Sequence, residues 1–159
     1  MYVPVGGAEC GFQATLTDVS LDPILERLTQ LAQLEPDWDS YGALAVSPVA
    51  FVKACQLLIH VKYSLSSLVG DLILPYDAAP IANGSLQLEW RSPHGNLEVE
   101  IKPDMSFSYL LIKGEGSERK FEEKNEVSLS EVLNVVSQLA TIIQISSQNC
   151  HDPSFLNHN

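Results

Sequence analysis

Residues 85–112 alternate between apolar and polar side chains in three successive runs, and this pattern restricts the fold more than any other feature of the chain. The apolar positions lie two apart in each run: Leu86, Leu88 and Trp90, then Leu97, Val99 and Ile101, then Phe107, Tyr109 and Leu111. A period of two is typical of β-strands with one face on a core and the other in water. The runs predict an antiparallel meander of three strands, and residues 119–123 allow a fourth.

The segments between the runs have the composition of turns. Asn83-Gly84 precedes the first run and predicts a type I′ hairpin turn, in which both central residues have positive φ. Residues 93–96 and Pro103-Asp104 predict the two turns that follow.

Three other segments carry apolar residues at helical spacing. The first begins at Asp22-Pro23, where Asp22 is expected to be the N-cap, and runs to about residue 34. The second begins at Ser47-Pro48 and ends near residue 63 or continues to residue 70. The third begins after Ser128, which with Glu131 has the spacing of a capping box.

Together these signals predict one α+β domain. Two N-terminal helices, an antiparallel three- or four-stranded meander and a C-terminal helix packed on one sheet face would bury each apolar surface against another. The domain is expected to span residues 20–145. Residues 1–19 have no assigned structure beyond a short strand at 12–16, and residues 146–159 are expected to form a loose polar tail.

The chain is strongly acidic. It has 9 Lys and Arg against 20 Asp and Glu, for a formal net charge of -11. Such a field repels nucleic-acid phosphates and anionic lipids, so we expect neither direct nucleic-acid binding nor membrane binding. It would attract a protein with a basic surface, and less strongly as salt rises. The alternative is that the charge serves solubility alone.

The cysteines indicate a reducing compartment. Cys10, Cys55 and Cys150 are odd in number and form no paired spacing, so they are expected to be reduced thiols. The N-terminal residues lack the pattern of a signal peptide, and no apolar run is long enough to span a bilayer. A cytoplasmic location is therefore expected.

The segment around Trp38 is the most distinctive local feature. Trp38 and Tyr41 flank Asp39, and aromatic residues in such a loop are favoured as anchors in protein interfaces. Alternatively, the two rings fill a gap between the helices and the sheet, while Asp39 or Ser40 holds the loop backbone. Both interpretations stay open at this level.

Three glutamates share the outward face of the expected sheet. Glu98 and Glu100 are two apart on one strand, about 6.6 Å along it, and Glu89 lies on the strand before. That separation resembles a glycosidase carboxylate pair. The alternative is a solvated acidic face, partly compensated by Arg91 and Lys102, that is available for partner binding. An open sheet face does not supply the burial that a general acid needs.

No motif points to a cofactor, a metal or a catalytic residue. The histidines are not at metal-ligand spacing: His60, His94, His151 and His158. The sequence contains no GxSxG, P-loop, GxGxxG or HExxH segment. We therefore expect no bound cofactor or metal.

Three ordered blocks resemble a group of small bacterial proteins of unknown function. They are WDSYGA at residues 38–43 leading into Ser47-Pro48, NGSLQLEW at residues 83–90 and LEVEIKPD at residues 97–104. The group carries W-D-G/S-Y-G-A, D-G-G-I-x-L-E-W and L-E-I-E-I-x-P-D-G in these places. Here Asn83 replaces Asp, while Ser85 and Met105 replace Gly. The resemblance implies the same fold, with some members encoded beside toxin-like genes, and it assigns no catalytic residue.

Two functional hypotheses follow. The first is a non-catalytic inhibitor or adaptor of the antitoxin or immunity type, which masks a basic partner surface through Trp38, Asp39, Tyr41, Glu89, Glu98 and Glu100. The second is a small hydrolase that uses Glu98 and Glu100, or Asp37 and Asp39. A self-associating structural subunit, and hence a homo-oligomer, is a further alternative.

Overall fold

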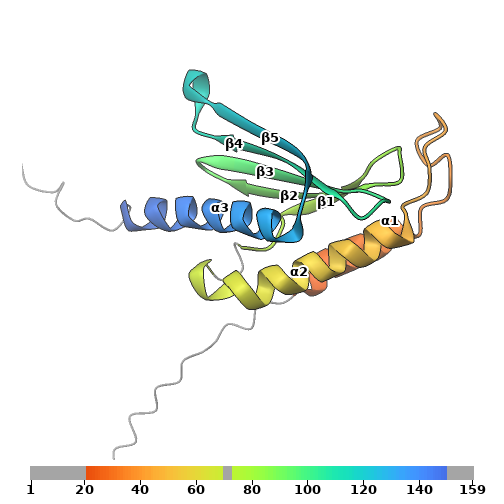
Figure 1. Cartoon of the computed structure of the whole chain (residues 1–159), viewed down its shortest axis with the longest axis horizontal. Helices are drawn as coiled ribbons and strands as arrows, with labels where there is room; N and C mark the ends of the chain where they lie inside the picture. Colours follow the sequence, from red (N-terminus) through yellow and green to blue (C-terminus); the bar gives the residue numbers. More distant parts are fainter. Residues whose placement is uncertain (1–20, 70–72, 150–159) are drawn as a thin grey trace, which may run out of the picture.

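The computed structural model describes residues 21–69 and 73–149, with side chains placed for 21–65 and 73–141. Three helices and five strands make up this part of the chain, with a short 3-10 turn, η2 (Gly116–Glu118), before the last strand. In chain order they are α1 (Asp22–Ala32), α2 (Pro48–Val69), β1 (Asp77–Pro80), β2 (Leu86–Ser92), β3 (Gly95–Ile101), β4 (Phe107–Lys113), β5 (Lys120–Val127) and α3 (Leu129–Asn149) (Figure 1).

The strands form one antiparallel sheet in the order β1-β2-β3-β4-β5. Neighbouring strands pair apolar residue with apolar residue, as in the row Leu88, Val99 and Tyr109. Because side chains alternate across a strand, this register gathers the apolar side chains of β2, β3 and β4 on one face. The predicted meander is therefore confirmed.

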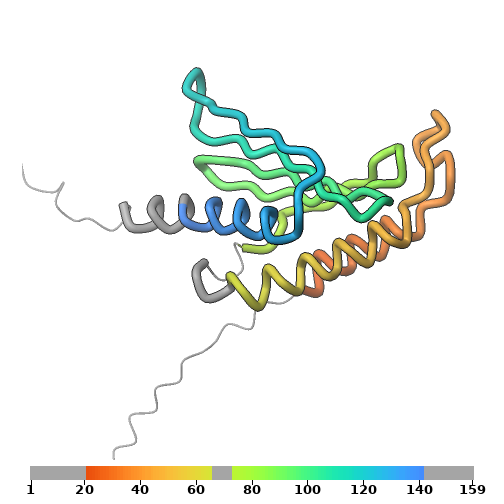
Figure 2. The backbone as a smooth tube through the Cα atoms, viewed as in Figure 1, coloured from red at the N-terminus to blue at the C-terminus, as the bar shows by residue number. Residues whose placement is uncertain are grey.

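All three described helices lie on that apolar face, and none of them covers the opposite face (Figures 1 and 2). α2 packs against β2 and β3, α3 packs against β3 and β4, and α1 packs beside β1. Trp90 is the largest fully buried side chain of this core, and its indole Nε1 donates a 2.7 Å hydrogen bond to the Ile73 carbonyl. That bond satisfies the only polar atom of a ring whose burial removes a large apolar area from water.

The helix boundaries match the expectations except at the first cap. α1 begins at Asp22, so the N-cap is Leu21, which makes no side-chain cap hydrogen bond. The prediction of Asp22 as N-cap is wrong: the helix begins one residue earlier, and Pro23 lies within its first turn, where a backbone N–H is not needed. The capping box is confirmed: the Ser128 amide donates to Glu131 Oε2 at 2.8 Å, and the Glu131 amide donates to Ser128 Oγ at 3.3 Å.

The sheet has five strands, two more than the three alternating runs of the sequence predict. β1 was not predicted, because Pro80 and the alanines before it give no strand pattern. Pro80 is compatible with β1 because it ends a short strand at the sheet edge, where no further ladder bond is needed. β5 extends to Val127, beyond the residue 119–123 segment predicted, and it raises the count to five strands.

The turns before β2 and β4 share one geometry, which is not type I′. Only Gly84 of the Asn83-Gly84 pair has positive φ, at 88°, so the type I′ prediction is wrong. The Gly84 amide donates to the Ile81 carbonyl and the Ile81 amide to the Ser85 carbonyl, as in a type I turn followed by a left-handed residue. Met105 takes the left-handed position of the second turn, with φ 74°.

Some expectations fall outside the described residues. The strand proposed at residues 12–16, Cys10 and Cys150 all lie there. α3 continues through residues 146–149, where the sequence suggested the start of the polar tail. Within residues 21–69 and 73–149, no helix combines the length and the apolar character needed to cross a membrane.

Candidate functional site

The candidate site is the sheet face that the helices leave uncovered, called here the open face. Its register rows follow from strand pairing: Gln87, Glu100 and Ser108 form one row, and Glu89, Glu98, Leu110 and Glu123 form the next. Glu89, Glu98 and Glu100 therefore share this face, as the alternation predicted. Four strands contribute polar side chains to a surface that could meet a partner.

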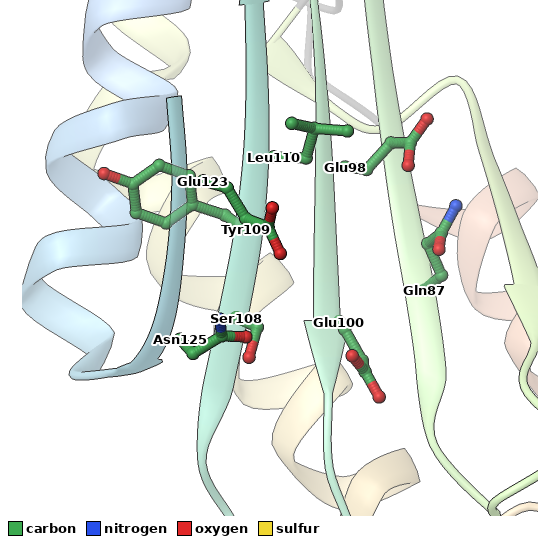
Figure 3. Close-up of a pocket in the computed structure, with 8 residues that line it drawn as sticks. All are labelled: Gln87, Glu98, Glu100, Ser108, Tyr109, Leu110, Glu123 and Asn125. Atoms are coloured by element: carbon green, nitrogen blue, oxygen red, sulfur yellow. The ribbon is translucent and has the colours of Figure 1, made fainter. Parts of the chain in front are cut away.

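The open face is hollowed rather than flat, which the sequence pattern did not indicate. A depression of about 200 Å³ lies over β3, β4 and β5, and we call it the acidic hollow. Figure 3 shows the side chains that line it, drawn from β2, β3, β4 and β5. Those used below are Glu98, Glu100, Ser108, Leu110, Glu123 and Asn125.

The glutamates of the open face are unequally compensated. Glu89 Oε2 lies 3.7 Å from an Arg91 guanidinium nitrogen, and Glu89 Oε1 accepts a 3.1 Å hydrogen bond from the side-chain Nε2 of Gln87. Glu98 stands directly across from Glu89 and, within the part of the chain that the structure describes, has no ion-pair or hydrogen-bond partner. Like charges in directly opposed positions destabilise a sheet.

The other two carboxylates of the acidic hollow also lack a cation among residues 21–65 and 73–141. Glu100 accepts one long hydrogen bond, 3.4 Å, from the Asn83 side chain, and Glu123 has no such partner. The expected compensation by Lys102 is not seen, since Lys102 makes no ion pair with them. The basic residues of β4 and β5 belong to the helix-facing register: Lys113, Lys120 and Lys124.

Arg91 is itself partly engaged, because its guanidinium carbon lies 4.5 Å from the centre of the Tyr76 ring. A second depression, of about 250 Å³, borders Glu89, Arg91 and Asn96 and shares Glu98 with the acidic hollow. Glu98 thus lies at the junction of two concave areas. An extended partner segment could follow the open face across both of them.

Ser108 is an unusual residue in the wall of the acidic hollow. Its side chain is only 7% exposed, and its Oγ has no hydrogen-bond partner. It lies at a β-bulge, because Phe107 pairs with Val127 whereas Tyr109 pairs with Lys124. Two residues, Asn125 and Glu126, therefore oppose Ser108, and Glu126 adopts a positive φ of 55°. Bulges re-aim side chains and are frequent beside binding sites.

The Trp38 loop is held mainly by its own carboxylates. Asp39 Oδ1 accepts hydrogen bonds from the Tyr41 and Ala43 amides at 2.8 and 3.1 Å, and these backbone donors lower the pKa of Asp39. Asp37 Oδ1 accepts a 2.7 Å hydrogen bond from the Gly42 amide. Asp37 and Asp39 thus each use one carboxylate oxygen, Oδ1, to hold the loop backbone.

The two aromatic side chains of this loop have different surroundings. Trp38 is half-buried and its Nε1 donates a 3.1 Å hydrogen bond to the Leu44 carbonyl. Tyr41 is 93% exposed, so it does not fill a gap between helices and sheet. Leu44 donates through its amide to the Ala82 carbonyl, which joins the loop to the turn that carries Asn83. The loop lies beside the turn between β1 and β2 (Figure 1). The Asn83 side chain in that turn donates to Glu100.

The remaining titratable residues do not assemble into a centre. His94 Nδ1 lies 3.2 Å from Glu115 Oε1 at an exposed turn. Cys55 is a free thiol whose pKa is raised by burial. In the residues that the structure describes, no group of three or more His, Cys, Asp or Glu side chains is arranged to hold a metal ion.

Sequence reasoning missed part of the hollow. Ser108 and Leu110 join it through the pairing of β4 with β3, and Glu123 and Asn125 join it through the pairing of β5 with β4 around the bulge. The fourth strand allowed at residues 119–123 ended at Glu123, whereas β5 continues to Val127.

No protein-family model, no curated protein and no solved structure matches the chain. Its function is therefore inferred from the geometry and charge of its own residues.

Proposed function

We propose that the chain is a non-catalytic protein-binding module whose open face covers a basic surface of a partner protein. The observation that carries this proposal is a helix-free sheet face with three carboxylates, Glu98, Glu100 and Glu123, that no described cation neutralises. A partner that supplies positive charge would remove their mutual repulsion. The net charge of -11 would steer such a partner toward the chain.

The Trp38 loop extends this surface at one end. Tyr41 and Leu44 expose apolar area there beside the turn that carries Asn83. Tyrosine is among the residue types enriched at interface hot spots. An inhibitor or adaptor of the antitoxin or immunity type, acting in a bacterial cytoplasm, fits this combination of acidic face and aromatic anchor.

Affinity capture from the native cell tests the proposal. The tagged wild-type chain is compared with a variant that carries Glu98→Gln, Glu100→Gln and Glu123→Gln. The control carries Glu26→Gln, Glu35→Gln and Glu118→Gln, which change the net charge equally at exposed positions away from the acidic hollow. Wild type and control should retain the same partner at low salt, and the hollow variant should lose it. Equal retention by all three would contradict the proposal.

A carboxylate-pair hydrolase is the second candidate, because Glu98 and Glu100 line one hollow about 6.6 Å apart along β3. Inverting glycosidases separate their carboxyl groups by about 6.5–9.5 Å. Glycan hydrolysis assayed with wild type and with the Glu98→Gln, Glu100→Gln double variant distinguishes the two. An activity lost in the variant, with unchanged thermal stability, would favour the hydrolase over the binding module.

A further inference from the structure

We propose that the acidic hollow is a receptor for one arginine side chain of the partner. This inference rests on the proposed function and adds the chemistry of the group that is recognised. The hollow presents an excess of hydrogen-bond acceptors: the carboxylates of Glu98, Glu100 and Glu123 and the side-chain carbonyl of Asn125 (Figure 3). Among the described residues, no cationic side chain donates a hydrogen bond to these carboxylates.

Ser108 supplies independent support for a ligand. A buried hydroxyl without a hydrogen bond costs roughly 1–3 kcal/mol, so native proteins rarely leave one unpaired. The Ser108 Oγ is such an atom, and its residue forms part of the wall between Glu100 and Asn125. Rotation about its Cα–Cβ bond between staggered positions would let it accept an N–H group that enters beside Glu100.

The spacing of the strands that carry the acceptors favours a guanidinium over an ammonium. Glu98 on β3 and Glu123 on β5 flank Leu110, so their strands lie two spacings apart, about 9.6 Å. One nitrogen at about 2.8 Å from an oxygen on each side spans only about 5.6 Å. A guanidinium is broader, and its five N–H groups point outward in one plane toward several acceptors at once.

Leu110 and the size of the hollow fit the rest of an arginine side chain. Leu110 gives the hollow an apolar, half-buried centre on which the methylene stem or the flat face of the guanidinium can lie. A volume of about 200 Å³ is far larger than a bare metal ion needs. The described carboxylates also form no metal-binding group. The apolar Leu110 and the volume of the hollow together favour a planar organic cation as the ligand.

Nuclear magnetic resonance of the full ¹⁵N-labelled chain tests the inference with three blocked tripeptides, Gly-Arg-Gly, Gly-Lys-Gly and Gly-citrulline-Gly. The arginine peptide should give saturable shifts of the Ser108, Leu110 and Glu123 amides. The lysine peptide should bind about tenfold more weakly, and the neutral citrulline peptide should not bind, because charge-assisted bonds carry the affinity. Equal arginine and lysine affinities, or shifts confined to other residues, would overturn the inference.

Two variants sharpen this test. Ser108→Ala, which removes one oxygen from a buried site, should weaken the arginine peptide about fivefold. Glu118→Gln, outside the hollow, should leave its affinity unchanged. Thermal unfolding establishes that both variants are folded, and an unchanged affinity in folded Ser108→Ala would overturn the role of the hydroxyl.

The inference and the proposed function can fail separately. If cellular capture depends on Glu98, Glu100 and Glu123 but the chain shows no arginine preference, the binding module stands and the arginine receptor does not. If the arginine peptide binds in the hollow but wild type captures no protein, the proposed function fails and the cation site remains.

Discussion

Glu98 faces Glu89 directly across β2 and β3, and only Glu89 has a basic neighbour, Arg91 at 3.7 Å. A like-charge pair directly across two strands, without a compensating charge, lowers the stability of the folded sheet. The same feature keeps an unneutralised carboxylate on the open face. The same carboxylate pair therefore lowers the stability of the isolated chain and favours the binding of a cationic group.

Replacing Glu98 should therefore stabilise the isolated chain. Glu98→Lys creates an opposite-charge cross-strand pair with Glu89, for which we expect a gain of about 0.2–1 kcal/mol in the free energy of unfolding at low salt. Urea denaturation measures it, with Glu118→Lys as the control for net charge. A loss of stability in Glu98→Lys, relative to the control, would mean that Glu98 has a stabilising role that the structure does not show.

Gly84 and Met105 occupy equivalent left-handed positions in the turns before β2 and β4, with φ of 88° and 74°. A Cβ at Gly84 would lie 3.2 Å from the Ala45 carbonyl oxygen, so Gly84→Ala combines crowding with an unfavourable φ. We expect Gly84→Ala to lose about 1–2 kcal/mol, since a left-handed non-glycine residue costs that much. Chemical denaturation of the variant against wild type gives the value, and an unchanged midpoint would contradict the assigned turn.

Met105→Gly is the complementary change. It removes the backbone strain of a left-handed methionine but increases the conformational freedom of the unfolded chain. Because these effects oppose each other, the net gain should be at most about 1 kcal/mol. Met105→Ala retains the strain and serves as the control. A glycine variant less stable than the alanine variant would contradict the backbone strain assigned to this left-handed position.

Tyr109 should determine part of the stability at alkaline pH. Burial, assisted by the hydrogen bond that its hydroxyl donates to Glu122 at 2.6 Å, raises the pKa of Tyr109 from 10.0 to about 12. The folded state favours the neutral phenol, so this contribution is complete below pH 10 and is lost as pH rises from 10 to 12. The loss should be on the order of 2 kcal/mol.

Comparison of wild type with Tyr109→Phe isolates that effect. The difference between their unfolding free energies should be constant up to pH 10 and then shift in favour of the variant by pH 12. Absorbance at 295 nm should show one tyrosine fewer titrating near pH 12 in the variant. A Tyr109 that ionises near pH 10 in the folded chain would refute the assigned environment.

Asp39 and Tyr41 should separate stability from binding in the Trp38 loop. Asp39→Ala removes the acceptor for two loop amides and should lower the thermal midpoint. Tyr41 is almost fully exposed, so Tyr41→Ala should change stability by no more than about 0.5 kcal/mol while weakening partner capture. If Tyr41→Ala binds as wild type does, the loop is a structural connection and not an anchor.

The parts of the fold that sequence reasoning predicted are those with one buried face. The alternation in β2 and β3 is regular because every second side chain is covered by helices. In β5 only Val127 is buried, so there is little apolar pattern to recognise. β1 is short and ends in Pro80, and it exists through its pairing with β2 and through Arg27, which donates to the Ala78 carbonyl at 3.1 Å.

The candidate site was predicted only in part for a related reason. Strand alternation placed Glu89, Glu98 and Glu100 on one face, because that follows from their spacing. The contribution of Glu123 and Asn125 depends on the register across the bulge between β4 and β5, which no local pattern specifies. A concave shape likewise arises from several strands together and has no signature in any one of them.

The salt dependence of partner binding tests the central claim most directly. The captured partner is purified, and its dissociation constant is measured at increasing sodium chloride concentrations. Three proteins are compared: wild type, a first variant with glutamine at Glu98, Glu100 and Glu123, and a second variant with glutamine at Glu26, Glu35 and Glu118. Our account predicts that wild type and the second variant weaken steeply and in parallel as salt rises, while the first variant binds weakly at low salt with a much shallower dependence. Equal affinities and equal salt dependences for all three proteins would contradict it.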